Sequence, residues 1–284
     1  MTSPGAFRNP QGRSLAYRLW QPPSCNALVV IVHGFGEHAG RYEPFARALM
    51  AHQIAVACPD LWGHGQSGGR RGDIARFDDY LNDLDAFMSQ VLTTRMIPSA
   101  FTIFGHSFGG LAAIHWALRK PQAAQALILQ SPLLDVGFPV PPWKARLIRG
   151  LAPWWPTFPV SMGLDPAWLS HDPAIVQRYR DDPLVHHRIT LRCAVALQDA
   201  MHHAMDRASH VTLPTLLLYA TADRVVSGSA CQRFAERLHC EKRVMSFSDC
   251  YHELHHESVQ PTIVEEIVRW VQAHGSPPRS TTPE

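Results

Sequence analysis

The sequence predicts an α/β protein, with a mostly parallel central sheet flanked by helices and an inserted helical cap. Short apolar runs alternate with helix-like stretches over residues 27–130, and the alternation resumes at residue 215. Strands that alternate with helices form β-α-β units, whose parallel strands are buried on both faces. The intervening residues 131–210 break the alternation, so they are predicted to form the cap.

The first half contains four apolar runs of strand length after a short N-terminal segment. We expect strands at 27–32, 54–60, 100–105 and 124–130, and helices at 41–52, at 77–92 and directly after residue 105. The 77–92 helix is supported by apolar residues at the spacing of one helix face: Phe77, Tyr80, Leu81, Leu84, Phe87, Met88, Val91 and Leu92.

The predicted cap is rich in proline and tryptophan at its start. Residues 131–165 include Pro132, Pro139, Pro141, Pro142, Pro153, Pro156 and Pro159, together with Trp143, Trp154 and Trp155. Helices are then predicted at 166–182 and 184–208. The regular pattern returns with strands at 215–223 and 243–249 and helices near 229–239 and 261–273. We therefore expect a core of residues 1–130 and 211–284, a cap of residues 131–210 and a flexible polar tail at 275–284.

Composition and charge exclude several classes of protein. Hydrophobic residues make up 46% of the 284 residues, which excludes an intrinsically disordered chain. The 26 basic and 24 acidic residues form no basic stripe, so no nucleic-acid partner is expected.

The six cysteines contain no C-x-x-C pair, which is typical of free thiols in a reducing compartment. We see no secretory signal and no run long enough to span a bilayer, so a cytoplasmic protein is expected. Transient contact of the cap with a membrane surface stays open, because such contact needs no spanning segment.

The segment Gly105-His106-Ser107-Phe108-Gly109 is the most informative motif. It is a G-x-S-x-G placed between a predicted strand and a predicted helix. In this arrangement the serine lies on a sharp, strained turn, and small residues two positions away let neighbouring backbone approach. Ser107 is therefore the candidate nucleophile.

A nucleophilic serine needs a base and an acid that orients the base. With this turn, the acid and the histidine follow in that order, each after a later strand. Asp223 ends the strand at 215–223, and His252 follows the strand at 243–249. Asp249 is an alternative acid, and His255 and His256 are alternative bases.

The oxyanion formed during ester attack needs two backbone N–H donors. Phe108, directly after the nucleophile, should supply one. Phe35, in the loop after the 27–32 strand, should supply the other.

The run His252-Glu253-Leu254-His255-His256 also matches the zinc-protease pattern H-E-x-x-H. Zinc binding would need the run inside a helix, with the two histidines one turn apart. Here the run follows a predicted strand, and the next predicted helix starts near Pro261. We expect no metal site and no other cofactor.

These motifs resemble those of the α/β-hydrolase superfamily, and within it the monoglyceride lipase and lysophospholipase group. The sharpest matches are the run from His33 to Tyr42, the run from Gly63 to Ser67, the Gly105–Gly110 turn and the run from Tyr251 to His255. The resemblance extends over most of residues 14–273 and is weakest in the cap. It implies an α/β-hydrolase fold and a serine hydrolase, cytosolic or peripherally membrane-associated, that cleaves single-chain acyl glycerides, lysophospholipids or related esters.

The resemblance also implies a polar subsite for the alcohol part of the ester, formed by Glu37, Arg41 and His255. The alternative is that Glu37 and Arg41 pair with each other and brace the loop, with His255 exposed.

Two other functions are open. One is a peptidase or amidase of the proline-aminopeptidase type, which would need an acidic anchor for the substrate amine, with Asp165, Asp172, Asp181 and Asp182 as candidates in the cap. The other is a non-catalytic lipid-binding module, which would need a broken triad. The sequence gives neither the acyl chain length nor the oligomeric state.

Overall fold

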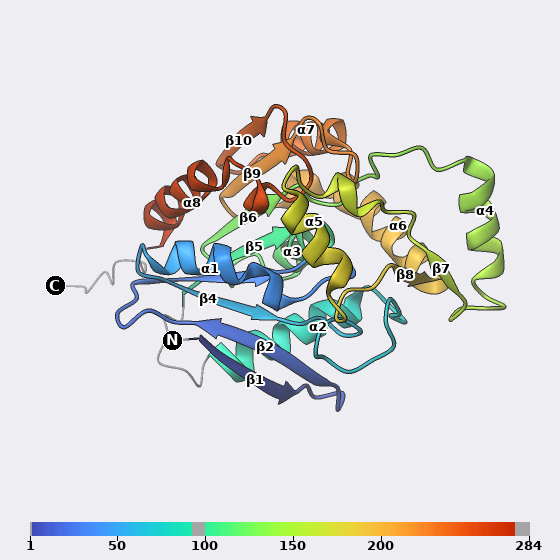
Figure 1. Cartoon of the computed structure of the whole chain (residues 1–284), viewed down its shortest axis with the longest axis horizontal. Helices are drawn as coiled ribbons and strands as arrows, with labels where there is room; N and C mark the ends of the chain where they lie inside the picture. Colours follow the sequence, from blue (N-terminus) through green and yellow to red (C-terminus); the bar gives the residue numbers. More distant parts are fainter. Residues whose placement is uncertain (1, 93–99, 276–284) are drawn as a thin grey trace.

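The computed structural model describes residues 2–92 and 100–275. Within these ranges the chain forms an eight-stranded sheet with the strand order β1-β2-β4-β3-β5-β6-β9-β10 (Figure 1). The strands are β1 Thr2–Arg8, β2 Ser14–Trp20, β3 Ala27–Val32, β4 Ile54–Pro59, β5 Thr102–His106, β6 Ala126–Gln130, β9 Thr215–Ala220 and β10 Lys242–Phe247. From β4 to β10 the neighbouring strands pair in parallel, as predicted.

The N-terminal hairpin was not predicted. β1 and β2 pair antiparallel with each other, and β2 pairs antiparallel with β4. They extend the parallel sheet at one edge, where the sequence indicated only a short segment.

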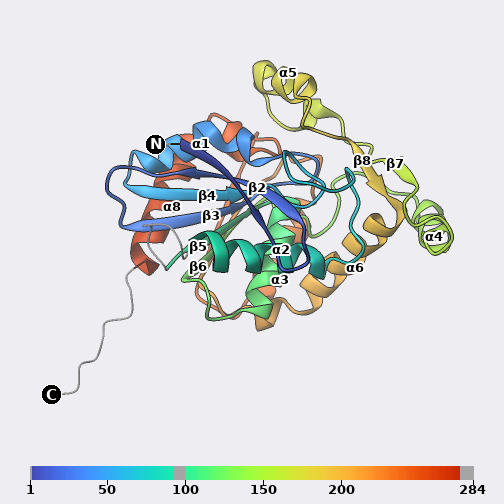
Figure 2. The same ribbon diagram turned by 90° about the horizontal axis from the view of Figure 1, so that it is seen from below.

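Helices cover both faces of the sheet (Figures 1 and 2). On one face pack α1 Glu43–Met50 and α8 Gln260–His274. On the other pack α2 Asp78–Phe87, α3 Phe108–Arg119 and α7 Gly228–Arg237. The predicted 77–92 helix is present as α2, which continues in a π-helical turn over Met88–Leu92.

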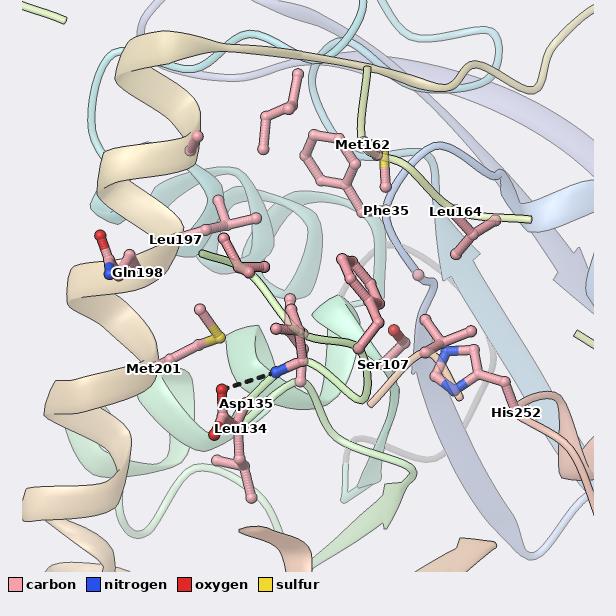
Figure 3. A pocket seen from close by; sticks show the side chains of 18 of the residues that line it. Phe35, Ser107, Leu134, Asp135, Met162, Leu164, Leu197, Gln198, Met201 and His252 are labelled. Carbon is pink, nitrogen blue, oxygen red and sulfur yellow. Dashed lines mark hydrogen bonds between the residues drawn. The ribbon is translucent and has the colours of Figure 1, made fainter. Parts of the chain in front are cut away.

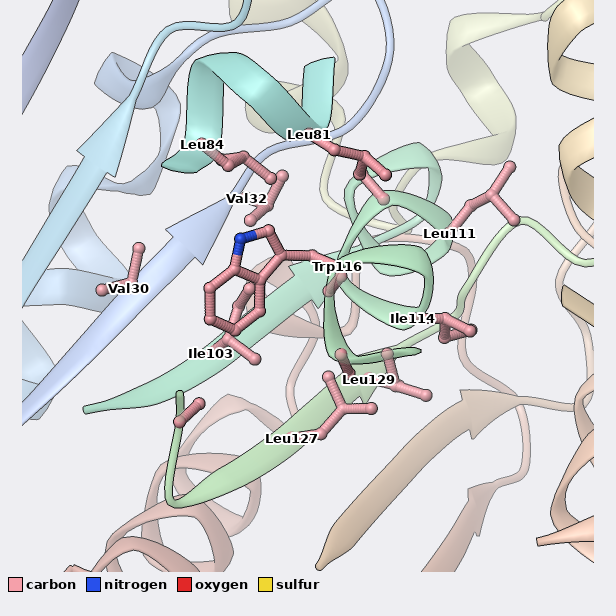
Figure 4. Close-up of a cluster of buried hydrophobic side chains, with 14 of the residues drawn as sticks. Val30, Val32, Leu81, Leu84, Ile103, Leu111, Ile114, Trp116, Leu127 and Leu129 are labelled. Carbon is pink, nitrogen blue, oxygen red and sulfur yellow. The ribbon is translucent and has the colours of Figure 1, made fainter. Parts of the chain in front are cut away.

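The larger core lies between the sheet and α2 and α3 (Figure 4). Trp116 of α3 is buried there among Val30, Ile103 and Leu127, and its indole N–H donates to Asp85 at 2.9 Å. This packing fixes α3 behind β5, and with it the turn that carries Ser107.

Between β6 and β9 the chain forms α4 Pro142–Leu151, β7 Pro159–Ser161, α5 Pro173–Asp181, β8 Arg188–Thr190 and α6 Leu191–Asp206. Short 3-10 turns lie at Ala39–Tyr42, Pro166–Trp168, Ala208–His210 and Leu254–His256. The predicted 184–208 helix is wrong at its start, because Arg188–Thr190 pairs antiparallel with β7. α4 was not predicted as a separate helix.

Of the predicted tail, residues 276–284 lie outside the described residues. No helix in the described part of the chain is long and apolar enough to cross a membrane.

Candidate active site

Ser107 sits on a strained turn between β5 and α3. Its φ of 54° and ψ of −120° are unfavourable for a residue with a side chain, and such a conformation costs about 1–3 kcal/mol. The flanking glycines make the turn sterically feasible. A Cβ on Gly105 would collide with the carbonyl oxygen of Gly109, and one on Gly109 would collide with that of Val32. The G-x-S-x-G spacing thus lets β3, β5 and α3 meet at the serine.

His252 and Asp223 form a buried pair beside this turn. His252 Nδ1 lies 2.8 Å from Asp223 Oδ2. The other oxygen, Asp223 Oδ1, accepts from the backbone N–H groups of Val225 and Val226 at 2.8 and 3.0 Å. The carboxylate is held on both sides, so Nδ1 carries the proton and Nε2 is free to accept one. Figure 3 shows the Ser107 and His252 side chains next to each other in the same cavity.

Two opposing effects act on the pKa of His252. Burial lowers it, but the negative charge and hydrogen bond of Asp223 outweigh burial, so the net pKa is raised above the ordinary value. The neighbouring imidazole behaves differently: burial lowers the pKa of His106 to about 4. Because of this low pKa, His106 stays neutral. Its ring centroid lies 4.7 Å from that of His252, the candidate base.

The alternative acid and bases are placed elsewhere. Asp249 lies in the turn after β10 with a φ of 55°, and the partner of His252 is Asp223. His256 Nδ1 is bound to Glu253 at 2.7 Å, and His255 Nδ1 is bound to Gln130 at 2.6 Å.

Phe35 follows the carboxyl end of β3, and Phe108 lies at the start of α3. Their ring centroids are 5.4 Å apart. Phe108 is the first residue of α3, and N–H groups in a first helical turn have no partner within their own helix. Phe35 lines the cavity, and the positive φ of Gly36 (82°) turns the chain after it. The predicted oxyanion donors thus lie in the loop after β3 and in the first turn of α3, both of which border the cavity at Ser107.

Glu37 and Arg41 pair with each other, as the bracing alternative expected, and they also line the cavity. Arg41 Nη1 donates to Glu37 Oε2 and Glu253 Oε1, both at 2.6 Å, and Nη2 donates to Glu253 Oε2 at 2.8 Å. The Tyr42 hydroxyl and the Gly34 N–H donate to Glu37 Oε1. Although burial alone would raise the pKa values of Glu37 and Glu253, the Arg41 charge lowers both.

His255 does not line the cavity, contrary to its predicted role. It is fully buried, stacks on Tyr42 with ring centroids 4.9 Å apart and accepts from Gln130 Nε2. The 3-10 turn Leu254–His256 places it in the interior between Tyr42, Phe45 and His106. The alternative of an exposed His255 is wrong as well.

Two polar residues of this wall, Glu253 and Tyr179, were not among the predicted site residues. Tyr179 comes from α5 of the cap, and the Arg41 guanidinium lies 4.6 Å from its ring centroid. The position of Glu253 directly after His252 was an available signal.

The H-E-x-x-H run does not adopt the zinc-protease geometry, because it lies in an irregular turn and His252 is paired with Asp223. Potential ligand atoms of Glu253, His255 and His256 lie within 4.8 Å of one another. However, both oxygens of Glu253 are bound to Arg41, and one of them also to His256. An adjacent guanidinium and occupied carboxylate oxygens do not suit a metal cation.

A cavity of about 830 Å³ extends from Ser107 into the cap. Its polar end is formed by Glu37, Arg41, Glu253 and Tyr179. Its longer part is mostly apolar and is formed by residues from the loop after β6, the segment 160–164 and α6 (Figure 3), among them Leu133, Leu134, Val136, Phe138, Met162, Leu164, Leu197 and Met201. The polar residues Asp135, Lys144, Gln198, His202 and Arg233 also line the cavity. The serine thus lies in a cavity that offers an apolar wall and a hydrogen-bonding wall.

Comparison with known proteins identifies the family. A family model described as serine aminopeptidase, S33, matches residues 23–259. The monoglyceride lipase of Rattus norvegicus is 31% identical over 93% of this chain and 88% of its own length. The monoacylglycerol lipase of Mycolicibacterium smegmatis is 28% identical over 95% and 96%. An uncharacterized abhydrolase domain-containing protein of Dictyostelium discoideum is 33% identical over 91% of this chain, which spans 28% of that relative's length.

A solved structure, that of Paleococcus ferrophilus monoacylglycerol lipase, superimposes with a TM-score of 0.83 at 32% identity, covering 92% of this chain and 99% of the other. The fold, the turn at Ser107 and these relatives agree with one another. The chain belongs to the monoglyceride lipase-like serine hydrolases of the α/β-hydrolase superfamily.

Proposed function

We propose that this protein hydrolyses carboxylic esters of single-chain lipids, with monoacylglycerols as the leading substrate class. One observation carries the proposal: the strained Ser107 and the His252–Asp223 pair lie in a cavity with a long apolar part and a charged, hydrogen-bonding wall. A monoacylglycerol has the same division, because its acyl chain is apolar and its alcohol carries hydroxyls. The monoglyceride lipase relatives support the same class.

In the proposed reaction, Ser107 Oγ attacks the ester carbonyl carbon while its proton passes to His252 Nε2. The carbonyl electrons move onto the oxygen, and the N–H groups of Phe35 and Phe108 stabilise that oxyanion. When the tetrahedral intermediate collapses, the ester C–O bond breaks and His252 gives the proton to the departing alcohol. Water then attacks the acyl-serine by the same route, which releases the fatty acid and restores Ser107.

The proposed subsite for the alcohol is the wall formed by Glu37, Arg41, Glu253 and Tyr179. Sites that hydrogen-bond a substrate hydroxyl reject analogues without it more strongly than apolar walls do, because the analogue leaves buried polar groups unpaired. Glycerol hydroxyls near Arg41 would form hydrogen bonds with the polar groups of this wall. The apolar part of the cavity would hold the acyl chain.

The description of the family model keeps a second candidate, an aminopeptidase, in view. Such an enzyme needs a carboxylate for the substrate ammonium. The four cap candidates do not line the cavity: Asp165 and Asp172 accept from backbone N–H groups at the starts of short helices, Asp181 accepts from Gln177, and Asp182 accepts from His38. Glu37 and Glu253 line it, but both are hydrogen-bonded to the Arg41 guanidinium, whose positive charge would repel a substrate ammonium. The residues that line the cavity therefore suit an ester substrate better than a peptide with a free amine.

Initial rates on four substrates test the proposal: a long-chain monoacylglycerol, lysophosphatidylcholine, p-nitrophenyl butyrate and prolyl-p-nitroanilide. We expect the monoacylglycerol to be cleaved with the highest kcat/KM and Ser107→Ala to lose about 10⁴-fold or more of the activity. Preferential cleavage of the nitroanilide would favour the aminopeptidase, and activity retained by Ser107→Ala would contradict the proposed nucleophile.

We further propose that the cap contacts a membrane surface transiently, as a peripheral protein does. Trp143, Trp154, Trp155 and Phe158 are 65%, 79%, 60% and 58% exposed, so they do not pack the cap onto the core. α4 stands apart from the body in both views (Figures 1 and 2). Lys144 and Arg146 on this helix supply positive charge, whereas Arg149 is paired with Asp199. Amphipathic helices with basic and aromatic residues bind lipid interfaces.

Sedimentation with anionic phosphatidylglycerol vesicles tests this contact. Replacing Trp154 and Trp155 with Ser should reduce vesicle binding and the rate on long-chain substrate, while the rate on p-nitrophenyl acetate stays unchanged. Equal loss on both substrates, with vesicle binding intact, would contradict membrane contact.

A further inference from the structure

The cap segment Trp168–His186 is bonded to two loops of the site, the one that carries His252 and the one that carries Phe35. At one end, the backbone carbonyls of Trp168 and Leu169 accept from the N–H groups of His252 and Glu253 at 3.4 and 2.8 Å. His171 adds two hydrogen bonds to Glu257, from its backbone N–H at 2.7 Å and through Nδ1 at 3.0 Å. This end of the segment therefore holds the loop that carries His252.

The other end of the segment holds the loop that carries Phe35. The His186 N–H donates to the Gly36 carbonyl at 2.9 Å, and His38 Nε2 lies 2.9 Å from Asp182 Oδ2. A Cβ on Gly36 would collide with the His186 carbonyl oxygen, so the two backbones touch. These contacts join residues about 144 positions apart in sequence.

The contacts of His38 define which ring nitrogen donates and which accepts. His38 Nδ1 accepts from the Gly40 N–H at 3.1 Å, so in the neutral ring the proton is on Nε2. Nε2 then donates to Asp182 Oδ2, while Asp182 Oδ1 accepts from the Leu184 N–H at 2.8 Å. Asp182 thus ties its own turn to His38 with one oxygen for each.

Two bonds and two short stretches of backbone form a closed ring, which we call the loop clasp. Asp182 binds His38, and the chain leads from His38 back to Gly36. Gly36 binds His186, and the chain leads from His186 back to Asp182. Phe35, whose N–H is the proposed oxyanion donor, directly precedes Gly36. A shift of the clasp would therefore move that N–H. Catalytic geometry is sensitive to such shifts, since a displacement of about 1 Å can cost about 10²-fold in rate.

α4 is attached very differently. None of its residues is buried, and its side-chain hydrogen bonds to the rest of the described chain run from Arg149 to the exposed Asp199 and to Gln198 on α6. Exposed ion pairs of this kind contribute little to stability. The cap therefore divides into a loosely held α4 and a segment that is bonded to the catalytic loops.

We propose that Asp182 is a positioning residue for the oxyanion loop: through His38 and the loop clasp, it fixes the Phe35 N–H for catalysis. The proposal rests on the proposed esterase function. In this proposal, the cap residue Asp182 affects the rate of the catalytic step by positioning the oxyanion donor, in addition to the cap's role in lining the cavity.

Three variants separate positioning from simple stabilisation. Asp182→Ser keeps a side-chain oxygen that can cap the Leu184 N–H but is too short to reach His38. Asp182→Asn has a single acceptor oxygen, so it can keep the bond from His38 Nε2–H only by giving up the bond from the Leu184 N–H. It should therefore restore kcat even where it lowers the melting temperature. Asp181→Ser is the matched control, because Asp181 is the exposed last residue of α5, directly before Asp182, and binds only Gln177 in the described structure.

The readouts are kcat per active site on p-nitrophenyl butyrate, with sites counted by fluorophosphonate titration, and inhibition by an alkyl trifluoromethyl ketone. The hemiketal oxyanion of this inhibitor occupies the oxyanion hole. Asp182→Ser should lower kcat about 10- to 100-fold with KM within about twofold, and weaken the inhibitor by a similar factor. Asp182→Asn and Asp181→Ser should stay within about threefold of the unmodified protein.

Unchanged kcat per active site in Asp182→Ser, even with a lower melting temperature, would overturn the positioning role. An Asp182→Asn variant as impaired as Asp182→Ser would overturn it too. Ser107→Ala, measured alongside, keeps the two proposals distinct: activity that survives Ser107→Ala would contradict the esterase mechanism and the clasp together, whereas an unaffected Asp182→Ser would contradict the clasp alone.

Discussion

At the scale of single residues, the Asp223 charge decides the protonation of His252. Burial alone would favour the neutral ring, and Asp223 reverses that effect, so the pKa is raised. A general base must be neutral, and kcat/KM should therefore rise with pH through an apparent pKa above about 6.5. Asp223→Asn removes the charge, so we expect this limb to move to lower pH and kcat to fall about 10⁴-fold. A pH–rate profile checks both, and an unmoved limb would contradict the assignment of Asp223.

Sequence order was sufficient to predict that Ser107, Asp223 and His252 lie near one another, because each follows a strand whose carboxyl end lies at the same edge of the sheet. It was not sufficient for Tyr179, which reaches the site from the cap, where no regular pattern fixes the path of the chain. His255 failed for a related reason: three residues after His252, the direction of its side chain depends on a 3-10 turn that the sequence pattern does not reveal.

At the scale of elements, the close contact between α3 and β3 predicts the effect of replacing Gly109 with alanine. Gly→Ala inside a helix normally stabilises by about 0.5–1 kcal/mol. At Gly109 the new methyl group would meet the Val32 carbonyl, so Gly109→Ala should instead destabilise by about 1–3 kcal/mol. Gly150 of α4 is the matched control, since a Cβ there meets nothing within 4 Å. Thermal melts should show a lower Tm for Gly109→Ala and an equal or higher one for Gly150→Ala. The same Tm change for both would contradict this packing.

The elements that the sequence predicted well are those with a buried, periodic face, such as α2 and the parallel strands. Those it missed lack one. β1 is largely exposed and contains Pro4 and Gly5, α4 buries none of its residues, and β8 has only three residues, too few to show an alternation.

At the scale of the whole molecule, the sheet brings Ser107, His252 and Asp223 together, and the cap adds residues of α4, α5 and α6 to the cavity wall. Its segment Trp168–His186 is bonded to both catalytic loops, while α4 stands apart with exposed aromatic residues. The cavity joins these parts and divides into an apolar region and a polar wall. This division is what favours a lipid ester with a polar alcohol as substrate.

The central claim is that Ser107 is the nucleophile of a lipid ester hydrolase, and labelling with an alkyl fluorophosphonate tests it most directly. Intact-mass spectrometry should show a single adduct, and peptide mapping should place it on Ser107. Ser107→Ala should stay unlabelled, and a long-chain monoacylglycerol should slow labelling of the unmodified protein by competition. An adduct on another residue, or labelling that persists in Ser107→Ala, would contradict the claim.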